Sequence, residues 1–166
     1  LIAMGSSKVL VIGTDTLSRI TDWSDRNTAV LFADGSGAVV LEAVDGPGQM
    51  LSWDIDADGS AEESLYAELG GFIQMEGKEV FRRAVRIMVD SATKSLTAAG
   101  LTADDVDVVI PHQANIRIIQ AACERLGIPM EKASTVLHYT GNTSSASIPT
   151  SVNSLAACST MRSVEP

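Results

Sequence analysis

The chain has 166 residues, of which 45% are hydrophobic, and 12 basic against 21 acidic side chains give it a net charge of −9 at pH 7. This length and apolar content are sufficient for one domain with a buried core, and they exclude a disordered chain. The acidic balance argues against general binding to nucleic acid or to an anionic membrane, because either partner would require a basic surface.

The beginning of the chain predicts the end of a helix followed by a strand. Residues 1–4 lack a basic segment before a cleavable apolar stretch, and no apolar run approaches the ~18 residues of a membrane span. Gly5 is typical of a helix stop, so we expect that polypeptide precedes Leu1. The β-branched residues 8–12, closed by Gly13, predict a buried strand.

Further extended segments are predicted in the next part of the chain. Residues 28–32 and 38–44 predict two strands around a glycine turn at residues 34–37. Residues 50–55 are interpreted as one more strand. The acidic and aperiodic residues 56–71 predict a surface excursion.

The clearest helix is predicted at residues 75–99. Its apolar residues recur at steps of three and four, and Gly100 ends the pattern. The opposite face carries Lys78, Arg82 and Arg86 at a spacing of one helical turn, which forms a basic stripe on an acidic protein.

Strands and helices alternate in the last third of the chain. Residues 106–110 and 135–138 predict strands, whereas residues 116–126 and 144–157 predict helices. This order implies a parallel sheet with helices packed on it. In such sheets, ligands bind beyond the carboxyl ends of the strands.

A histidine and an asparagine follow those two predicted strands. His112 lies in Pro-His-Gln-Ala-Asn after residues 106–110, and Asn142 lies in Gly-Asn-Thr-Ser after residues 135–138. Together they can donate hydrogen bonds to one carbonyl oxygen. From the residues alone, a general base, a structural histidine and a capping asparagine remain alternatives. No second histidine or carboxylate lies nearby in the sequence, so no metal site is expected.

The two cysteines are not predicted to be reactive. Cys123 and Cys158 lie in Ala-rich helical stretches without a nucleophile elbow, and their spacing fits neither a disulfide framework nor a zinc site. A reducing, cytoplasmic location is therefore expected.

Four motifs in a fixed order resemble β-ketoacyl-[acyl-carrier-protein] synthase III. They are Val-Ile-Gly-Thr-Asp-Thr-Leu-Ser-Arg at 11–19, Phe-Ala-Asp-Gly-Ser-Gly-Ala-Val-Val-Leu at 32–41, Pro-His-Gln-Ala-Asn at 111–115 and Gly-Asn-Thr-Ser at 141–144. The resemblance runs from Leu1 to about Leu155 and covers the C-terminal half of that family's chain. It implies a role in fatty-acid biosynthesis.

The implied fold is a thiolase-like α/β half. The resemblance predicts a mixed, mostly parallel sheet with packed helices, without the family's N-terminal half and without its last two strands. Residues 1–158 would form this truncated domain, and residues 159–166 would form a divergent tail. The apolar surface left exposed predicts a homo-oligomer or a complementary N-terminal half as partner.

The implied activity is that of an acyltransferase, a decarboxylative Claisen condensation. In the family, a cysteine of the N-terminal half takes an acyl group from acyl-CoA, and malonyl-acyl-carrier protein is decarboxylated and condensed with it. By resemblance, His112 and Asn142 donate hydrogen bonds to the malonyl thioester carbonyl. The resemblance implies no cofactor, because CoA, acyl-CoA and the malonyl thioester are substrates.

Other positions match family residues that contact the substrates or the carrier protein. Phe81 matches the mouth of the active-site tunnel, Gly77 and Asn115 match the pantetheine arm, and Arg19 matches a position near the CoA adenine. Arg117 matches a basic residue that docks the acyl-carrier protein.

The basic stripe of Lys78, Arg82 and Arg86 suits the same acidic partner. A solvated helix face is the alternative interpretation of these three residues.

Three hypotheses follow, because the family's nucleophilic cysteine is absent from this chain. The chain is an enzyme that works with a separately encoded Cys-bearing half, or an inactive thiolase-fold fragment that self-associates or binds carrier protein or CoA. The third hypothesis is a piece of an ordinary synthase cut before Leu1.

Overall fold

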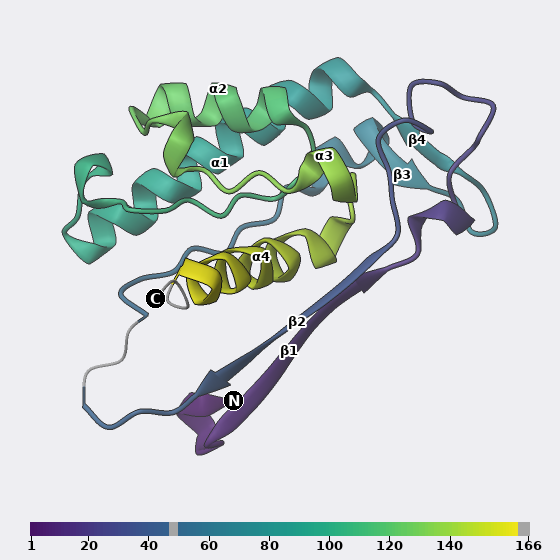
Figure 1. Cartoon of the computed structure of the whole chain (residues 1–166). Helices are drawn as coiled ribbons and strands as arrows, with labels where there is room; N and C mark the ends of the chain where they lie inside the picture. The colour runs from purple at the N-terminus through teal and green to yellow at the C-terminus, as the bar shows by residue number, and fades with distance from the viewer. Residues whose placement is uncertain (47–49, 163–166) are drawn as a thin grey trace.

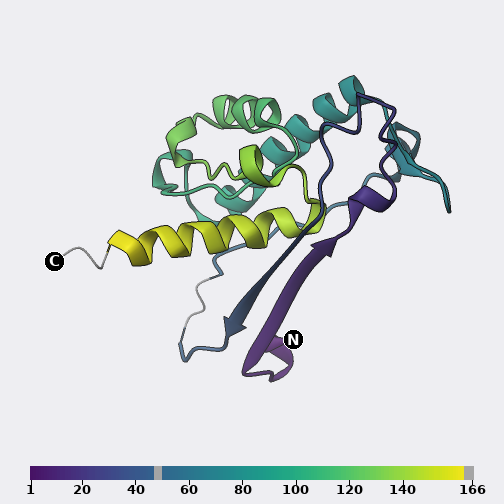
Figure 2. The same ribbon diagram turned by 45° about the vertical axis from the view of Figure 1, so that its right-hand side comes forward.

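The computed structural model describes the backbone of residues 1–46 and 50–162 and the side chains of residues 1–46 and 50–157. Its named strands and helices are β1 (Lys8–Asp15), β2 (Gly35–Glu42), β3 (Leu65–Ala67), β4 (Ile73–Met75), α1 (Gly77–Ala99), α2 (Ile116–Leu126), α3 (Leu137–Thr140) and α4 (Ser147–Arg162). Short 3-10 turns lie between them. In both views, α4 lies between the β1–β2 ribbon and the α1–α2 pair (Figure 1 and Figure 2).

The strands β1 and β2 form an antiparallel ribbon. Its register places Gly13 opposite Gly37. The ribbon keeps large apolar side chains exposed, with Leu10 60%, Ile12 59% and Val40 63% accessible. The strand predicted at residues 8–12 is present as part of β1, but the prediction that it is buried is wrong, because most of its side chains are exposed. The apolar surface expected to be left exposed makes this ribbon a candidate contact surface.

The predicted strand at residues 28–32 is wrong, as is the glycine turn at residues 34–37. Asp25 accepts hydrogen bonds from the backbone N–H of Asn27 and the hydroxyl of Thr28, and these bonds fold the segment into turns. The segment's pairing with residue 142 is limited to an isolated parallel bridge between Phe32 and Asn142, made by the carbonyl of Leu31 and the N–H of Ala33. The predicted turn residues 35–37 lie within β2 instead.

Two other predicted strands are also wrong. Residues 50–55 form no regular element. Residues 135–138 were predicted to form a strand, but residues 137–140 form the short helix α3. The predicted strand at residues 106–110 is reduced to one parallel bridge between Val109 and Ala133. Among the described residues, the named strands therefore pair antiparallel, and parallel pairing is limited to isolated bridges.

The three predicted long helices are confirmed. They are α1, α2 and α4, and Gly100 and Gly127 end the first two with positive φ angles of 70°. The helices α1 and α2 pack together, and each has a fully buried side chain, Val85 in α1 and Ile119 in α2. The last helix includes residues 159–162 of the predicted tail, and residues 163–166 lie outside the described residues. No described helix is long and apolar enough to cross a membrane.

The first turn of α4 and the loop before it lie directly on the ribbon, because the ribbon has glycines there. A Cβ on Gly13 would overlap the carbonyl oxygen of Ser145. A Cβ on Gly35 would lie 2.6 Å from Cβ of Thr143, and a Cβ on Gly37 would lie 2.9 Å from Cβ of Pro149. These close approaches position residues 143–149 against β1 and β2.

We expect Gly13→Ala to lower the free energy of unfolding by about 2 kcal/mol, because the overlapping atom belongs to the backbone and cannot rotate away. Gly59→Ala is the matched control, since a Cβ there meets nothing within 4 Å. Urea unfolding followed by circular dichroism measures both. Equal midpoints for the two variants would contradict this account of the ribbon.

Candidate active site

The structure brings His112 and Asn142 to the same cleft. This cleft has a volume of about 1160 Å³, and a smaller cavity of about 270 Å³ is lined by the same two side chains. The walls of the larger cleft also include apolar side chains: Leu31, Phe32, Leu65, Met75, Val80, Phe81 and Ile118. A mostly apolar cleft with a few polar groups is typical of a site that binds a small molecule or a flexible arm.

Hydrogen bonds fix both the backbone of Asn142 and the oxygen of its side-chain carboxamide. The backbone N–H donates to Leu31 at 2.9 Å, and the carbonyl accepts from Ala33 at 2.9 Å. The side-chain Oδ1 accepts from the backbone N–H of Ser144 at 3.0 Å, and Ser144 adopts an uncommon φ of 50°. Because a backbone N–H requires an acceptor, this bond assigns Oδ1 and leaves the Nδ2 amide as the donor for a ligand.

The imidazole of His112 is half-buried and contacts a buried serine. Its Nδ1 lies 2.7 Å from Oγ of Ser147, the first residue of α4. Burial lowers the pKa of His112 below its ordinary value of 6.5. The ring is therefore neutral at pH 7, with Nε2 as the nitrogen left for a ligand.

Gln113 fixes the backbone next to His112, and sequence analysis did not single it out. Its side chain is fully buried and makes four hydrogen bonds. Nε2 donates to the carbonyls of Pro111 at 2.9 Å and Ser134 at 3.0 Å. Oε1 accepts from the N–H groups of Val136 at 2.9 Å and Leu137 at 3.2 Å, so these groups are not available for pairing in a strand.

The loop between Asn142 and α4 is also tied to the first strand. Asp15 accepts from the backbone N–H of Ser145 at 2.9 Å and from its hydroxyl at 2.5 Å. Both hydrogen bonds lower the pKa of Asp15, and the bond from the Ser145 hydroxyl has the larger effect. The ionised carboxylate thus holds the loop that positions both Asn142 and Ser147.

Of the residues matched to the tunnel mouth, the pantetheine arm and the CoA adenine, three line the cleft. They are Phe81, Gly77 and Asn115. The side-chain oxygen of Asn115 accepts from the backbone N–H of Arg117 at 2.9 Å, so this residue also caps α2. Arg19 is exposed and is not among the residues that line the cleft.

The basic residues predicted to dock a carrier protein separate into groups. Lys78 and Arg117 line the cleft. Arg82 instead pairs with Glu79, with Nη2 and Oε1 2.6 Å apart. Hydrogen bonds from Arg82 and then Arg83 lower the pKa of Glu79 to about 2, so this pairing is present at neutral pH.

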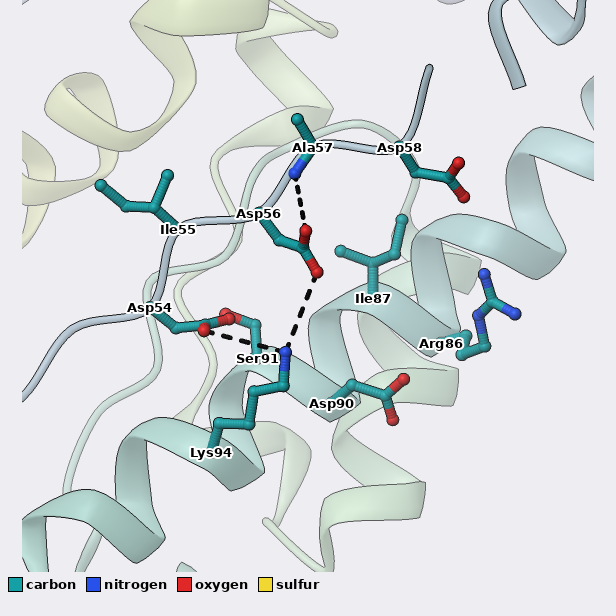
Figure 3. A pocket seen from close by; sticks show the side chains of 10 residues that line it. All are labelled: Asp54, Ile55, Asp56, Ala57, Asp58, Arg86, Ile87, Asp90, Ser91 and Lys94. Carbon is teal, nitrogen blue, oxygen red and sulfur yellow. Dashed lines mark hydrogen bonds and ion pairs between the residues drawn. The ribbon is translucent and has the colours of Figure 1, made fainter. Parts of the chain in front are cut away.

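Arg86 lines a different cavity of about 490 Å³, on the side of α1 that faces the segment 54–58 (Figure 3). Acidic side chains dominate this cavity, including Asp54 and Asp90. Lys94 lies 3.8 Å from both Asp54 and Asp56. The predicted basic stripe is therefore interrupted by acidic neighbours, and it does not form a continuous positive surface.

Cys123 is one of the buried residues of α2, and burial raises the pKa of its thiol. A buried thiol of this kind is unreactive. The side chain of Cys158 lies outside the described residues. The described part of the chain contains no group of three histidine, cysteine or acidic side chains that could hold a metal ion.

Comparison with protein families identifies the chain. A model described as 3-oxoacyl-[acyl-carrier-protein] synthase III matches residues 1–59, and a model of the C-terminal part of the same synthase matches residues 96–164. The chain belongs to the β-ketoacyl-[acyl-carrier-protein] synthase III family. Synthase III of Geobacillus kaustophilus is 55% identical over 144 residues, which cover 87% of this chain and 46% of that protein. Synthase III 1 of Bacillus cereus is 53% identical over 141 residues, which cover 85% of this chain and 45% of that protein.

Solved structures agree with this synthase III assignment. The synthase III of Aquifex aeolicus has a TM-score of 0.91 and 43% identity, covering 95% of this chain and 51% of that one. The Thermus thermophilus enzyme has a TM-score of 0.89 and 40% identity, covering 95% and 53%. The thiolase-like α/β class with packed helices is thereby confirmed, and the chain spans about half the length of the relatives it matches.

Within this synthase III chain, Gln113 and Ser147 are the two site residues that the sequence analysis missed. The signal for Gln113 is its place inside Pro-His-Gln-Ala-Asn, directly after His112. The signal for Ser147 is the run of hydroxyl side chains at residues 143–147, where a predicted helix begins. Hydroxyls at a helix start usually cap it, so their contact with a distant histidine was not predictable from spacing.

Proposed function

We propose that this chain carries the decarboxylation half of a synthase III active site. His112 and Asn142 donate hydrogen bonds to the thioester carbonyl of malonyl-acyl-carrier protein in a decarboxylative Claisen condensation. The observation that supports this most directly is that two side chains, each with its other polar atom already bonded, line one cleft. Their free N–H groups are the donors that a developing enolate requires.

The chemistry is a charge-stabilisation problem. The bond between the malonyl methylene carbon and its carboxylate breaks, CO₂ leaves, and the electron pair moves to the thioester to form an enolate. Negative charge then develops on the thioester oxygen, where Nε2–H of His112 and Nδ2–H of Asn142 would bind it. The enolate carbon attacks an acyl thioester on a cysteine supplied by another half of the site, and the cysteine thiolate is the leaving group.

The cleft also suits the flexible arm of the substrate. Phe81 and Gly77 lie on α1, and Asn115 lies at the start of α2, so both helices line the cleft. A pantetheine arm, whether on CoA or on acyl-carrier protein, could extend between them toward His112. The proposal includes a cytoplasmic location and a homo-oligomer or a complementary Cys-bearing half as partner.

A second candidate function rests on the exposed ribbon. Leu10, Ile12 and Val40 leave more than half of their surface accessible, which is typical of a surface that another polypeptide covers. A non-catalytic chain that self-associates, or that binds carrier protein or CoA, would use this surface without turnover.

One experiment separates the two functions. The purified chain is sized by chromatography with light scattering, and the same peak is assayed for CO₂ release from malonyl-CoA, alone and with the Cys-bearing half of a relative. Decarboxylation supports the enzyme. An oligomer without CO₂ release under either condition supports the binding module, and a monomer without it contradicts both.

Arg117→Glu should weaken the binding of acyl-carrier protein by about tenfold. Arg117 is exposed at the cleft, and the negative charge of the glutamate that replaces it would repel the acidic partner. Arg82→Glu is the matched control, with an expected change of less than about twofold, because Arg82 already pairs with Glu79. Fluorescence anisotropy of labelled carrier protein measures both dissociation constants. Equal effects would reject the assignment of the docking residues to the rim of the cleft.

A further inference from the structure

The hydroxyl of Ser147 contacts the ring of His112, and the function proposed above assigns no chemical step to this serine. Oγ lies 2.7 Å from Nδ1, and only 1% of Ser147 is exposed. The contact joins residues that are 35 positions apart, on α4 and on the loop before α2. The carbonyl of Ser147 accepts from Ser151 at 2.9 Å, so the start of α4 is held internally as well.

Two hydrogen arrangements fit this distance. A neutral imidazole carries one ring proton, on Nδ1 or on Nε2. If the proton is on Nδ1, Ser147 accepts it, and the serine's own hydroxyl hydrogen needs a further acceptor. If the proton is on Nε2, Ser147 donates to Nδ1, and each polar hydrogen near the contact has a use.

The surroundings of Ser147 favour the second arrangement. In the part of the chain that the structure describes, His112 is the hydrogen-bond partner found for this hydroxyl. A buried donor without an acceptor costs free energy, whereas a spare lone pair on a hydroxyl oxygen costs little. In addition, Ser147 lies at the positive end of the α4 dipole, which disfavours a charged imidazolium beside it.

We propose that Ser147 is a positioning residue whose hydroxyl donates to Nδ1 of His112 and thereby holds the neutral ring as the Nε2–H tautomer. Its use in catalysis rests on the proposed function, because the Nε2–H group is the one that would bind the enolate oxygen. With the proton on Nδ1 instead, an Nε2 lone pair would face that oxygen and repel it. The structural part of the proposal requires no substrate.

The tautomer can be measured directly by NMR of the chain labelled with ¹⁵N-histidine. The sequence contains 2 histidines, so the variant His138→Gln leaves the signals of His112 alone. In this background we expect a protonated Nε2 and a bare Nδ1. Ser147→Ala should produce a mixture of tautomers, and Ser147→Thr, which retains the hydroxyl, should restore the original spectrum.

Malonyl-CoA decarboxylation supplies the second measurement. Ser147→Ala should lower kcat about tenfold, the factor that corresponds to one lost hydrogen bond, with KM unchanged. A protonated Nδ1 in the otherwise unaltered chain would overturn the proposal, as would an unchanged tautomer in Ser147→Ala. The spectrum of the serine-bearing chain decides the tautomer even if the alanine variant does not fold. The expected tautomer without any decarboxylation would uphold the role of Ser147 and count against the proposed function.

Discussion

Replacement of either His112 or Asn142 with alanine should lower malonyl-CoA decarboxylation by about 10²–10³-fold, the usual loss when one donor to a developing oxyanion is removed. The reason is geometric. Each side chain has one polar atom held by a serine, Ser147 for the histidine and Ser144 for the asparagine, which leaves Nε2 of His112 and Nδ2 of Asn142 for a ligand in the cleft. The loss should appear in kcat, because the negative charge exists only as the C–C bond breaks.

Two exposed residues provide matched controls for this experiment. His138→Ala removes the other histidine, and Asn153→Ala removes an asparagine from the surface of α4. Both should retain the original rate. Because the two donors bind the same oxygen, the double variant should lose less than the product of the single losses. Rates in His112→Ala and Asn142→Ala that match those of the controls would refute the assignment of the donor pair.

Gln113→Leu should lower the free energy of unfolding by about 4 kcal/mol, since four buried hydrogen bonds of roughly 1 kcal/mol each would be lost. Leucine has a similar volume, so the loss would come mainly from unpaired backbone groups and not from a cavity. Gln120→Leu is the control, because Gln120 is exposed on α2. It should change stability by less than about 0.5 kcal/mol.

Urea unfolding followed by circular dichroism measures this difference. Hydrogen exchange adds a local test, because the N–H groups of Val136 and Leu137 should lose protection when their acceptor on Gln113 is removed. If Gln113→Leu unfolds at the same urea concentration as Gln120→Leu, the side chain does not support the loop that carries His112.

The predictions made from sequence differ in accuracy for a physical reason. The helices α1 and α2 were predicted because apolar periodicity and a terminal glycine act over a few neighbouring residues. The segment around Val136 was predicted as a strand, and it is not one because its N–H groups bond to Gln113. Residues 28–32 were likewise apolar enough for a strand, but Asp25 folds them into turns.

The basic stripe shows the same limit of local reasoning. Lys78, Arg82 and Arg86 do share one face of a helix, as their spacing predicts. Only Lys78 lines the cleft, because Arg82 pairs with Glu79 and Arg86 lines the cavity beside Asp90. Charge spacing along a helix indicates which side chains lie together, but neighbouring carboxylates decide which of them remain available to a partner.

The sequence by itself determined the synthase III family and the two motifs that contain His112 and Asn142, because those residues are contiguous in the chain. Only the tertiary structure decided which atoms of those side chains are left for a ligand. Ser147 occupies one ring nitrogen of His112 across 35 positions, and Asp15 holds the loop of Asn142 across 130. Such partners meet only when the chain folds, so no local pattern in the sequence predicts them.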